Sequence, residues 1–370
     1  MKHRHNLLSL LYAASLILSA CATVLPTKLP EIDTPTTISP GITNVDFRSG
    51  YGVRAGRYEL YFTDPSSPLA LQATGGVDGP LVEALDSARL SIDVAAYSLG
   101  LNSVRNALLR AHDRGVTVRI VMETDNVDRS DPQILMKAGV PIVDDRLQGL
   151  MHDKFIVIDK SEVWLGSMNY TDSSTYEDNN NMIRIRSAKI AEDYLQEFEE
   201  MFSDNMFGPN VVAQTPNPTV TIDDTRIDVY FSPDDHVINA LAALLSAAQE
   251  SIYFLAFSFT SNELGDIVRE KAQAGLTISG VMDREQVLTN QGTEFDPFRQ
   301  AKLDVVIDGI EGQMHHKVFI VDDKIVALGS YNFSKSAEER NDENMIIVYN
   351  EDIAHEFMRE FQRVWAQASE

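Results

Sequence analysis

Hydrophobic and polar residues follow two alternating patterns along most of the chain. Short apolar runs, such as 91–96 and 116–122, predict buried strands, whereas residues 187–202 place apolar side chains three or four positions apart and predict an amphipathic helix. Asp78 and Pro80 are typical of a helix start. Because strand and helix patterns interleave, the sequence predicts an α/β fold, with a mixed sheet covered by helices on both faces.

The same order of elements occurs twice, and the two copies share side chains as well as pattern. The clearest matches are RYELYFT at 57–63 with RIDVYFS at 226–232, and Val121-Met122-Glu123 with Val281-Met282-Asp283. The repeat predicts two tandem α/β sandwich domains, at 57–203 and 226–370, joined by a linker at 204–225. A period of roughly 160 residues is too long for a solenoid, so each domain is expected to have its own core.

The first 56 residues lie outside the repeat. Residues 1–20 combine a basic start, an apolar run from Leu7 to Leu18 and a small pair at the end, which predicts a signal peptide. The apolar run is shorter than the roughly 20 residues that span a bilayer. Residues 21–56 are rich in Pro and Thr and have no apolar period, so we expect them to form an extended tether. Cys21 is the only cysteine, which excludes an internal disulfide framework.

The chain carries 55 acidic and 31 basic side chains, a formal net charge of −24. Proteins that hold nucleic acid without sequence preference present a basic surface, because neutralised phosphates release counterions. The charge therefore argues against nucleic acid as a partner.

The strongest identity between the copies lies in polar residues and not in the core. The segment His152-x-Lys154-x4-Asp159-x6-Gly166-Ser167-x-Asn169 recurs as His315-x-Lys317-x4-Asp322-x6-Gly329-Ser330-x-Asn332. A repeat kept only for packing would preserve hydrophobicity, so these polar identities indicate shared chemistry.

Strand alternation predicts how each motif presents its side chains. Successive residues of a strand point to opposite faces, so His152 and Lys154 share one face while Asp153 and Asp159 lie on the other. The same rule pairs His315 with Lys317 and turns His316 away, so we assign the second motif to His315. Asp159 and Asp322 lie at strand ends and are expected to brace the structure. Asn169 and Asn332 follow Gly-Ser turns and can donate amide hydrogens to a phosphate oxygen.

Two histidines, two lysines and two asparagines suit the cleavage of a phosphodiester. One imidazole can attack phosphorus, the other can protonate the leaving alkoxide, and the amide and ammonium donors can stabilise the developing negative charge. The histidines form no recognisable zinc or two-metal ligand pattern, so we expect neither a metal nor another cofactor.

The doubled motif resembles the phospholipase D superfamily, also called the HKD family, over essentially all of 57–367. The resemblance implies that both motifs meet across a pseudo-twofold axis in one active site, that the intermediate is a phosphohistidine, and that one chain acts as a monomer. It also implies catalytic roles for His152, Lys154, Asp159, His315, Lys317 and Asp322, and substrate contacts for Ser167, Asn169, Ser330 and Asn332.

An acidic residue commonly orients each histidine in this family. Counting 28 residues on from each motif histidine reaches Asn180 in the first copy and Glu343 in the second. We expect Glu343 beside His315, where a carboxylate favours the protonated ring, and Asn180 beside His152. This predicts His152 as the nucleophile and His315 as the general acid and then, for the attacking water, the general base. Alternatively, Glu177 or Asp178 takes the orienting role in the first copy.

A second resemblance concerns the N-terminus. Leu18-Ser19-Ala20-Cys21 resembles the lipobox of bacterial lipoproteins, which implies cleavage before Cys21 and lipidation of its thiol. The protein would then be exported and lipid-anchored to a bacterial membrane, on its periplasmic or cell-surface side.

These expectations favour a phospholipase D-like phosphodiesterase that hydrolyses the headgroup ester of a phospholipid to phosphatidic acid. A phosphatidyltransferase of the cardiolipin synthase type would use the same intermediate with an alcohol acceptor. An endonuclease is a further alternative, against which the acidity and the anchor count, and a non-enzymatic surface binding module is another. Loops at 125–132 and 286–298 are expected to form the pocket walls.

Overall fold

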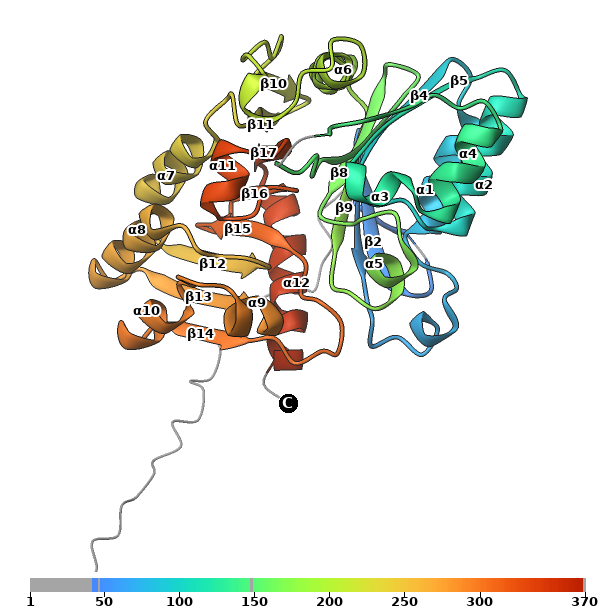
Figure 1. Ribbon diagram of the computed structural model, residues 1–370. Coiled ribbons are helices and arrows are strands. Elements are labelled where there is room, and N and C mark those ends of the chain that lie inside the picture. Colours follow the sequence, from blue (N-terminus) through green and yellow to red (C-terminus); the bar gives the residue numbers. More distant parts are fainter. Residues whose placement is uncertain (1–41, 46, 147–148, 369–370) are drawn as a thin grey trace, which may run out of the picture. The chain divides into compact units, whose positions relative to one another are not determined.

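The computed structural model describes residues 42–45, 47–146 and 149–368. Two mixed sheets, each covered by helices, make up this part of the chain (Figure 1). The predicted α/β class and the tandem arrangement are therefore confirmed. The predicted signal peptide and Cys21 lie outside the described residues. None of the described helices is long and apolar enough to span a membrane.

The first sheet has nine strands in the order β1-β2-β3-β9-β8-β7-β4-β5-β6. Its parallel strands β4, β5 and β6 adjoin an antiparallel remainder. The strands are β1 (Thr43–Val45), β2 (Gly50–Ala55), β3 (Tyr58–Thr63), β4 (Ser91–Ala96), β5 (Thr117–Met122), β6 (Ile142–Asp144), β7 (Lys154–Ile158), β8 (Glu162–Gly166) and β9 (Asn181–Ile185). The helices are α1 (Asp78–Ser87), α2 (Asn102–Asp113), α3 (Thr124–Val127), α4 (Ser130–Lys137), α5 (Asp172–Tyr176) and α6 (Ala188–Phe202), with short 3-10 turns at Ala70–Gln72 and, after α6, at Gly208–Asn210.

The second sheet repeats this topology in eight strands, in the order β10-β11-β17-β16-β15-β12-β13-β14. Its strands are β10 (Thr219–Ile222), β11 (Thr225–Ser232), β12 (Ser251–Ala256), β13 (Thr277–Met282), β14 (Asp304–Ile307), β15 (Lys317–Val321), β16 (Ile325–Gly329) and β17 (Glu343–Tyr349). The helices are α7 (Val237–Ala247), α8 (Asn262–Gln273), α9 (Arg284–Thr289), α10 (Phe295–Gln300), α11 (Lys335–Glu339) and α12 (Glu351–Ala368).

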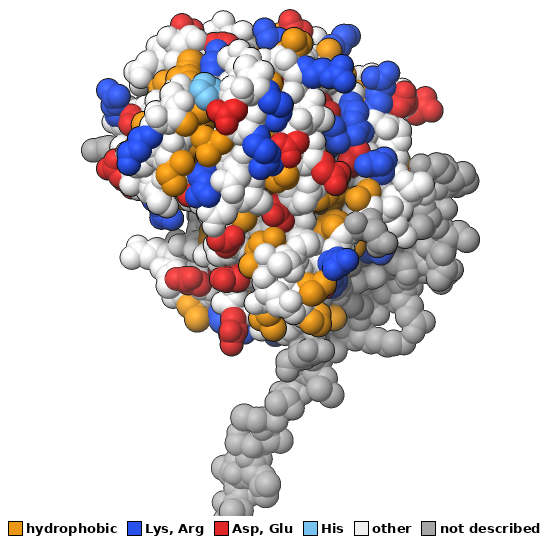
Figure 2. Space-filling model, turned by 90° about the vertical axis from the view of Figure 1, so that its right-hand side faces the viewer, with side chains coloured by type: hydrophobic (Ala, Val, Ile, Leu, Met, Phe, Trp, Pro, Cys, Tyr) orange, Lys and Arg blue, Asp and Glu red, His pale blue; other side chains and the backbone are white. Residues whose placement is uncertain are grey.

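Each sheet buries one apolar face under a pair of helices. In the first domain, Leu81 of α1 and Leu108 of α2 belong to a fully buried cluster with Ile92 and Ile156 of the sheet. The opposite, solvent side of this helix layer mixes basic and acidic side chains (Figure 2). The side chain of Arg110, for example, forms an ion pair with Asp86 at 2.7 Å.

The long helices α6 and α12 each cover the second face of their own sheet and reach the other domain. Ser187 caps α6 by accepting a hydrogen bond from the backbone amide of Ile190. The ring of Tyr194 on α6 then packs 5.0 Å from Phe231 of β11. On α12, Phe357 packs edge-on against Phe62 of β3, with ring centroids 5.0 Å apart.

Two predicted segment boundaries are wrong. The tether was expected to continue to residue 56, yet residues 43–45 and 50–55 form β1 and β2, which extend the first sheet. Residues 219–225, expected in the linker, form β10 and the start of β11. Both segments lack an apolar period, and they become strands because a neighbouring strand supplies the pairing, β3 for β2 and β11 for β10.

The domains exchange backbone hydrogen bonds at the residues that precede the two motif strands. The amide of His152 donates to the carbonyl of Asp342 at 3.0 Å, and the amide of His315 donates to the carbonyl of Asn179 at 2.9 Å. Both contacts form isolated parallel bridges, at Met151 with Asp342 and at Asn179 with Met314. Each motif histidine is thereby fastened to the other domain.

A glycine makes each of these crossings possible. A Cβ on Gly312 would lie 1.9 Å from the carbonyl oxygen of Glu177, and a Cβ on Gly149 would lie 2.1 Å from that of Arg340. Such distances are far below van der Waals contact, so any larger residue would force the two segments apart.

We therefore expect Gly312→Ala to destabilise the fold by about 1–3 kcal/mol and to displace His315. Thermal unfolding would measure the first effect and activity the second. Gly79→Ala is the matched control, because a Cβ there meets nothing within 4 Å and lies in helix α1. Equal unfolding temperatures for the two variants would contradict the proposed close approach.

Candidate active site

Both motif histidines lie at the domain interface with their lysines. His152 and His315 are 7% and 4% exposed and come just before β7 and β15, which begin at Lys154 and Lys317. The Lys154 Nζ donates to the carbonyl of His152 at 2.6 Å, and the Lys317 Nζ donates to that of His315 at 2.7 Å. The backbone crossings bring the two histidines to the same interface, and the charges of both lysines lower the pKa of each ring, which agrees with the single site that the resemblance implies.

The orienting partners are exchanged between the domains. His152 Nδ1 lies 2.7 Å from Glu343 Oε2, and His315 Nδ1 lies 2.9 Å from Asn180 Oδ1. The expected pairing of each histidine with the residue of its own copy is therefore wrong. The cause is the backbone crossing, because Asn179 and Asp342 carry the residues that follow them into the opposite half of the site.

The motif serines hold the orienting residues. Ser167 Oγ donates to Asn180 Oδ1 at 2.8 Å, and the Ser330 hydroxyl forms a hydrogen bond with the carboxylate of Glu343. Both serines are fully buried. The prediction that these hydroxyls contact substrate is wrong, because they bind Asn180 and Glu343 behind the histidines.

Asn169 and Asn332 are partly exposed, and Asn169 lines the cleft described below. Within the described residues, neither amide oxygen has a hydrogen-bond partner. Both oxygens are buried, so the expected donation of the amide hydrogens to a phosphate stays a prediction.

Asp159 and Asp322 lie at the far ends of β7 and β15, away from the histidines. The carboxylate of Asp159 accepts hydrogen bonds from the amides of Arg89, Leu90 and Ser91. Asp322 accepts the equivalent set from the amides of Gln249, Glu250 and Ser251. The structure therefore supports bracing rather than catalytic contact for these two residues.

His316 points away from the site, as strand alternation predicts. Its ring is fully buried between Asn181 and Glu360, with Nε2 2.8 Å from the glutamate oxygen. Asp153, at the matching position of the first copy, accepts a hydrogen bond from Asn344 at 2.6 Å.

Two aromatic rings under the histidines were not recognised from the sequence. Tyr97 packs 5.0 Å from the ring of His152 and 5.1 Å from Lys154 Nζ. Phe257 packs 4.6 Å from His315 and 4.5 Å from Lys317 Nζ. Both follow the strand beside the motif strand, in the repeated triplets Ala-Tyr-Ser and Ala-Phe-Ser, which is the signal that could have identified them.

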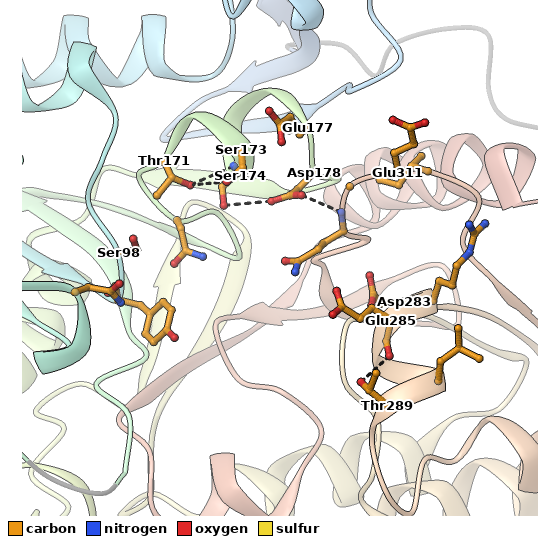
Figure 3. A pocket seen from close by; sticks show the side chains of 18 of the residues that line it. Ser98, Thr171, Ser173, Ser174, Glu177, Asp178, Asp283, Glu285, Thr289 and Glu311 are labelled. Atoms are coloured by element: carbon orange, nitrogen blue, oxygen red, sulfur yellow. Dashed lines mark hydrogen bonds between the residues drawn. The ribbon is translucent and has the colours of Figure 1, made fainter. Parts of the chain in front are cut away.

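A cleft of about 830 Å³ opens beside these groups and takes lining residues from both domains (Figure 3). The predicted loops contribute Asn126 and Arg129 on one side, and Leu288 and Thr289 on the other, although short helices replace the expected loops. Further wall segments at 171–178 and 310–313 were not predicted. The charged lining residues are mainly acidic: Glu177, Asp178, Asp283, Glu285 and Glu311, against Arg129 and Arg284.

Burial sets the protonation of the site. Desolvation and the two lysine charges hold the pKa of His152 and of His315 well below the ordinary histidine value. Desolvation also lowers the pKa of Lys154 to about 7 and raises that of Glu343 to about 8. A neutral histidine has a free ring nitrogen for attack, and a bound phosphate anion would favour the charged form of the lysines. Among the described residues, no group of three or more His, Cys, Asp or Glu could hold a metal ion.

The doubled site and the paired sheets define a class of enzyme with one active site built from two halves. A family model described as "Cardiolipin synthase, PLD-like domain" matches residues 81–202 and 228–365, which is more than half of the chain. The chain belongs to this family, within the phospholipase D superfamily.

Relatives match single portions of the chain. Mitochondrial cardiolipin hydrolase of Canis lupus familiaris is 33% identical over 130 residues, which cover 35% of this chain and 51% of the relative. Phospholipase D of Rickettsia bellii is 26% identical over 154 residues, covering 40% of this chain and 76% of the relative. The chain thus spans only about half the length of the cardiolipin hydrolase.

Similarity of fold extends over both domains. The crystal structure of phosphatidylserine synthase from Haemophilus influenzae aligns with a TM-score of 0.62 at 12% identity, covering 80% of this chain and 86% of that one. This likeness supports the two-domain fold.

The depressed pKa of Lys154 predicts a pH dependence. An ammonium that is needed to bind an anionic diester is present below its pKa and lost above it, so kcat/KM should fall above about pH 7. In the enzyme–substrate complex the bound anion raises the pKa, so kcat should fall only at higher pH. Steady-state kinetics across this range would measure both profiles.

Lys154→Arg is the control for this profile, because a guanidinium stays protonated throughout. Its kcat/KM should be lower but should lack the alkaline decline. A wild-type kcat/KM that stays constant up to about pH 9 would contradict the role of Lys154.

Proposed function

We propose that this protein is a phosphodiesterase that hydrolyses the headgroup ester of a phospholipid through a phosphohistidine intermediate. The observation that carries the proposal is the pair of buried histidines, oriented through Nδ1, that share one interface with two lysines and two asparagines. A phosphate held between them would meet a nucleophile on one side and a proton donor on the other.

The exchanged orienting partners support His152 as the nucleophile, for a different reason from the one the sequence offered. When Glu343 is ionised, as a positive ring beside it favours, His152 Nδ1 donates to it, Nε2 carries the lone pair that attacks phosphorus, and the carboxylate stabilises the positive ring of the phosphohistidine. Asn180 is neutral, and its amide is fixed because Nδ2 donates to the carbonyl of Ser174. It orients His315 without adding a negative charge that would raise the pKa of the ring, which suits a group that must give up its proton.

The relatives support a lipid substrate. By their names, a cardiolipin hydrolase and a phospholipase D act on phospholipids, and the matching family model carries a lipid enzyme's name. The name of that model, cardiolipin synthase, keeps a phosphatidyltransferase as the second candidate, since an alcohol in place of water would release the same intermediate. The predominantly acidic cleft lining disfavours a nucleic-acid strand.

We further propose that the enzyme is exported, lipid-anchored through Cys21 to a bacterial membrane, and monomeric. The anchor would place the cleft near its phospholipid substrate. Both halves of the site come from one chain, so a second copy is not needed for catalysis.

The direct test assays the full chain in EDTA on mixed micelles of phospholipid and detergent with added glycerol, and in parallel on single-stranded DNA and RNA. Free headgroup together with phosphatidic acid is the expected result. A new glycerol ester would establish the transferase instead, and cut nucleic acid beside intact lipid would overturn the proposed substrate. His152→Asn is the blank, and His112→Asn, on the surface helix α2, is the matched histidine control.

The nucleophile is tested by trapping. His315→Asn lacks the general base that activates water, so we expect it to accumulate a substituted His152 that wild type turns over. The reaction would be quenched in alkali, because the nitrogen–phosphorus bond is acid-labile, and the modified peptide identified by mass spectrometry. A phosphoryl group on His315 in the converse variant, His152→Asn, with none on His152 in the first, would reverse the assignment.

A further inference from the structure

One carboxylate in each domain links a helix of the cleft wall to the segment that carries the catalytic histidine. In the first domain, Glu123 directly follows β5 and caps α3, accepting from the amide of Asp125 at 3.3 Å. Its second oxygen accepts from the amide of Met151 at 3.0 Å, one residue before His152. Glu123 is 2% exposed and lies outside the doubled motif.

The second domain repeats this arrangement with a shorter side chain. Asp283 directly follows β13 and caps α9, accepting from the amide of Gln286 at 2.9 Å. Its other oxygen accepts from the amide of Met314 at 3.1 Å, one residue before His315. Glu123 and Asp283 occupy matched positions of the repeat, so an acid of either length makes the same two contacts.

Each carboxylate thus joins a helix at the cleft wall to the backbone just before a catalytic histidine. Among the described residues, the side chains of Glu123 and Asp283 make no other hydrogen bonds. Asn126 of α3 lines the cleft together with Arg129, which directly precedes α4, and α9 contributes Leu288 and Thr289. The amides of Met151 and Met314 are buried next to the backbone crossings. A carboxylate that accepts from both sides fixes the distance between the substrate wall and the histidine, and a buried amide left without its acceptor costs about 1–3 kcal/mol.

We propose that Glu123 and Asp283 are positioning residues, with Glu123 aligning the nucleophile His152 and Asp283 aligning the general acid His315 against bound substrate. The assignment of separate roles rests on the proposed function. Misplacement of a reacting group by about 1 Å can cost on the order of 10²-fold in rate. Loss of Glu123 is therefore expected to slow attack by His152, and loss of Asp283 to slow the proton transfers of His315.

The test compares Glu123→Gln and Asp283→Asn in the full chain on bis(p-nitrophenyl) phosphate and on phospholipid micelles. The first-turnover burst of p-nitrophenolate reports attack by His152, because this leaving group departs without a proton donor. We expect Glu123→Gln to slow the burst by about 10-fold or more, and Asp283→Asn to leave the burst near wild type while lowering steady-state turnover and phospholipid cleavage. Glu123→Asp and Asp283→Glu, which keep the carboxylate, should recover most of the lost rate.

Ser261→Ala is the matched control, because Ser261 caps α8 through the amide of Leu264 and has no contact with a histidine segment among its described hydrogen bonds. It should lose stability without any change in burst or turnover. Equal slowing of the burst by Glu123→Gln and Asp283→Asn, or wild-type rates in both, would overturn the proposal.

A readout that needs no substrate separates this inference from the proposed function. The rate of diethylpyrocarbonate modification at each histidine, followed by mass spectrometry, should change at His152 in Glu123→Gln and at His315 in Asp283→Asn. If these selective changes occur in a protein that cleaves no diester, the positioning role stands and the proposed function fails. Unchanged modification at both histidines would overturn the positioning role itself.

Discussion

The site depends on the reciprocal crossing of the two domains. The backbone amide of each histidine donates to a carbonyl of the other domain, and each ring is oriented by a side chain of that same segment. Neither half can place its histidine alone, because the residues that fix the ring come from the opposite copy. Gly149 and Gly312 allow the segments to approach, and the long helices α6 and α12 pack across the same interface.

Because the chain is a repeat, the same contacts occur in both domains. Because some matched positions hold different residues, the two halves can take different roles. Behind His315, His316 meets Glu360, which in turn binds Arg363 at 2.6 Å. Behind His152 the matching positions hold Asp153 and Glu197, and burial together with repulsion from neighbouring carboxylates raises the pKa of both carboxyls. Beside the rings themselves, Glu343 contacts one histidine and Asn180 the other, so the two halves differ both next to the histidines and at the positions of His316 and Asp153.

Much of this arrangement could be predicted from the sequence. The motif identities located both histidines and lysines, and strand alternation correctly turned Asp153 and His316 away from the site. The exchange of Glu343 and Asn180 could not be predicted. Each lies 28 residues after the histidine of its own copy, and this spacing does not show which of the two histidines it contacts. The edge strands β1, β2 and β10 were missed because their pairing, and not an apolar period, makes them strands. The repeated Gly-x-Met-His before each motif is visible in the sequence, but its meaning depends on a backbone contact between domains.

The central claim is that each catalytic histidine is oriented by the other copy. Nitrogen-15 spectra of the imidazoles in Glu343→Gln test it most directly, with His152→Asn and His315→Asn providing the resonance assignments. The account predicts that the Nδ1 resonance of His152 shifts while that of His315 is unchanged. A shift at His315 with His152 unaffected would contradict the crossed arrangement and restore the pairing within each copy.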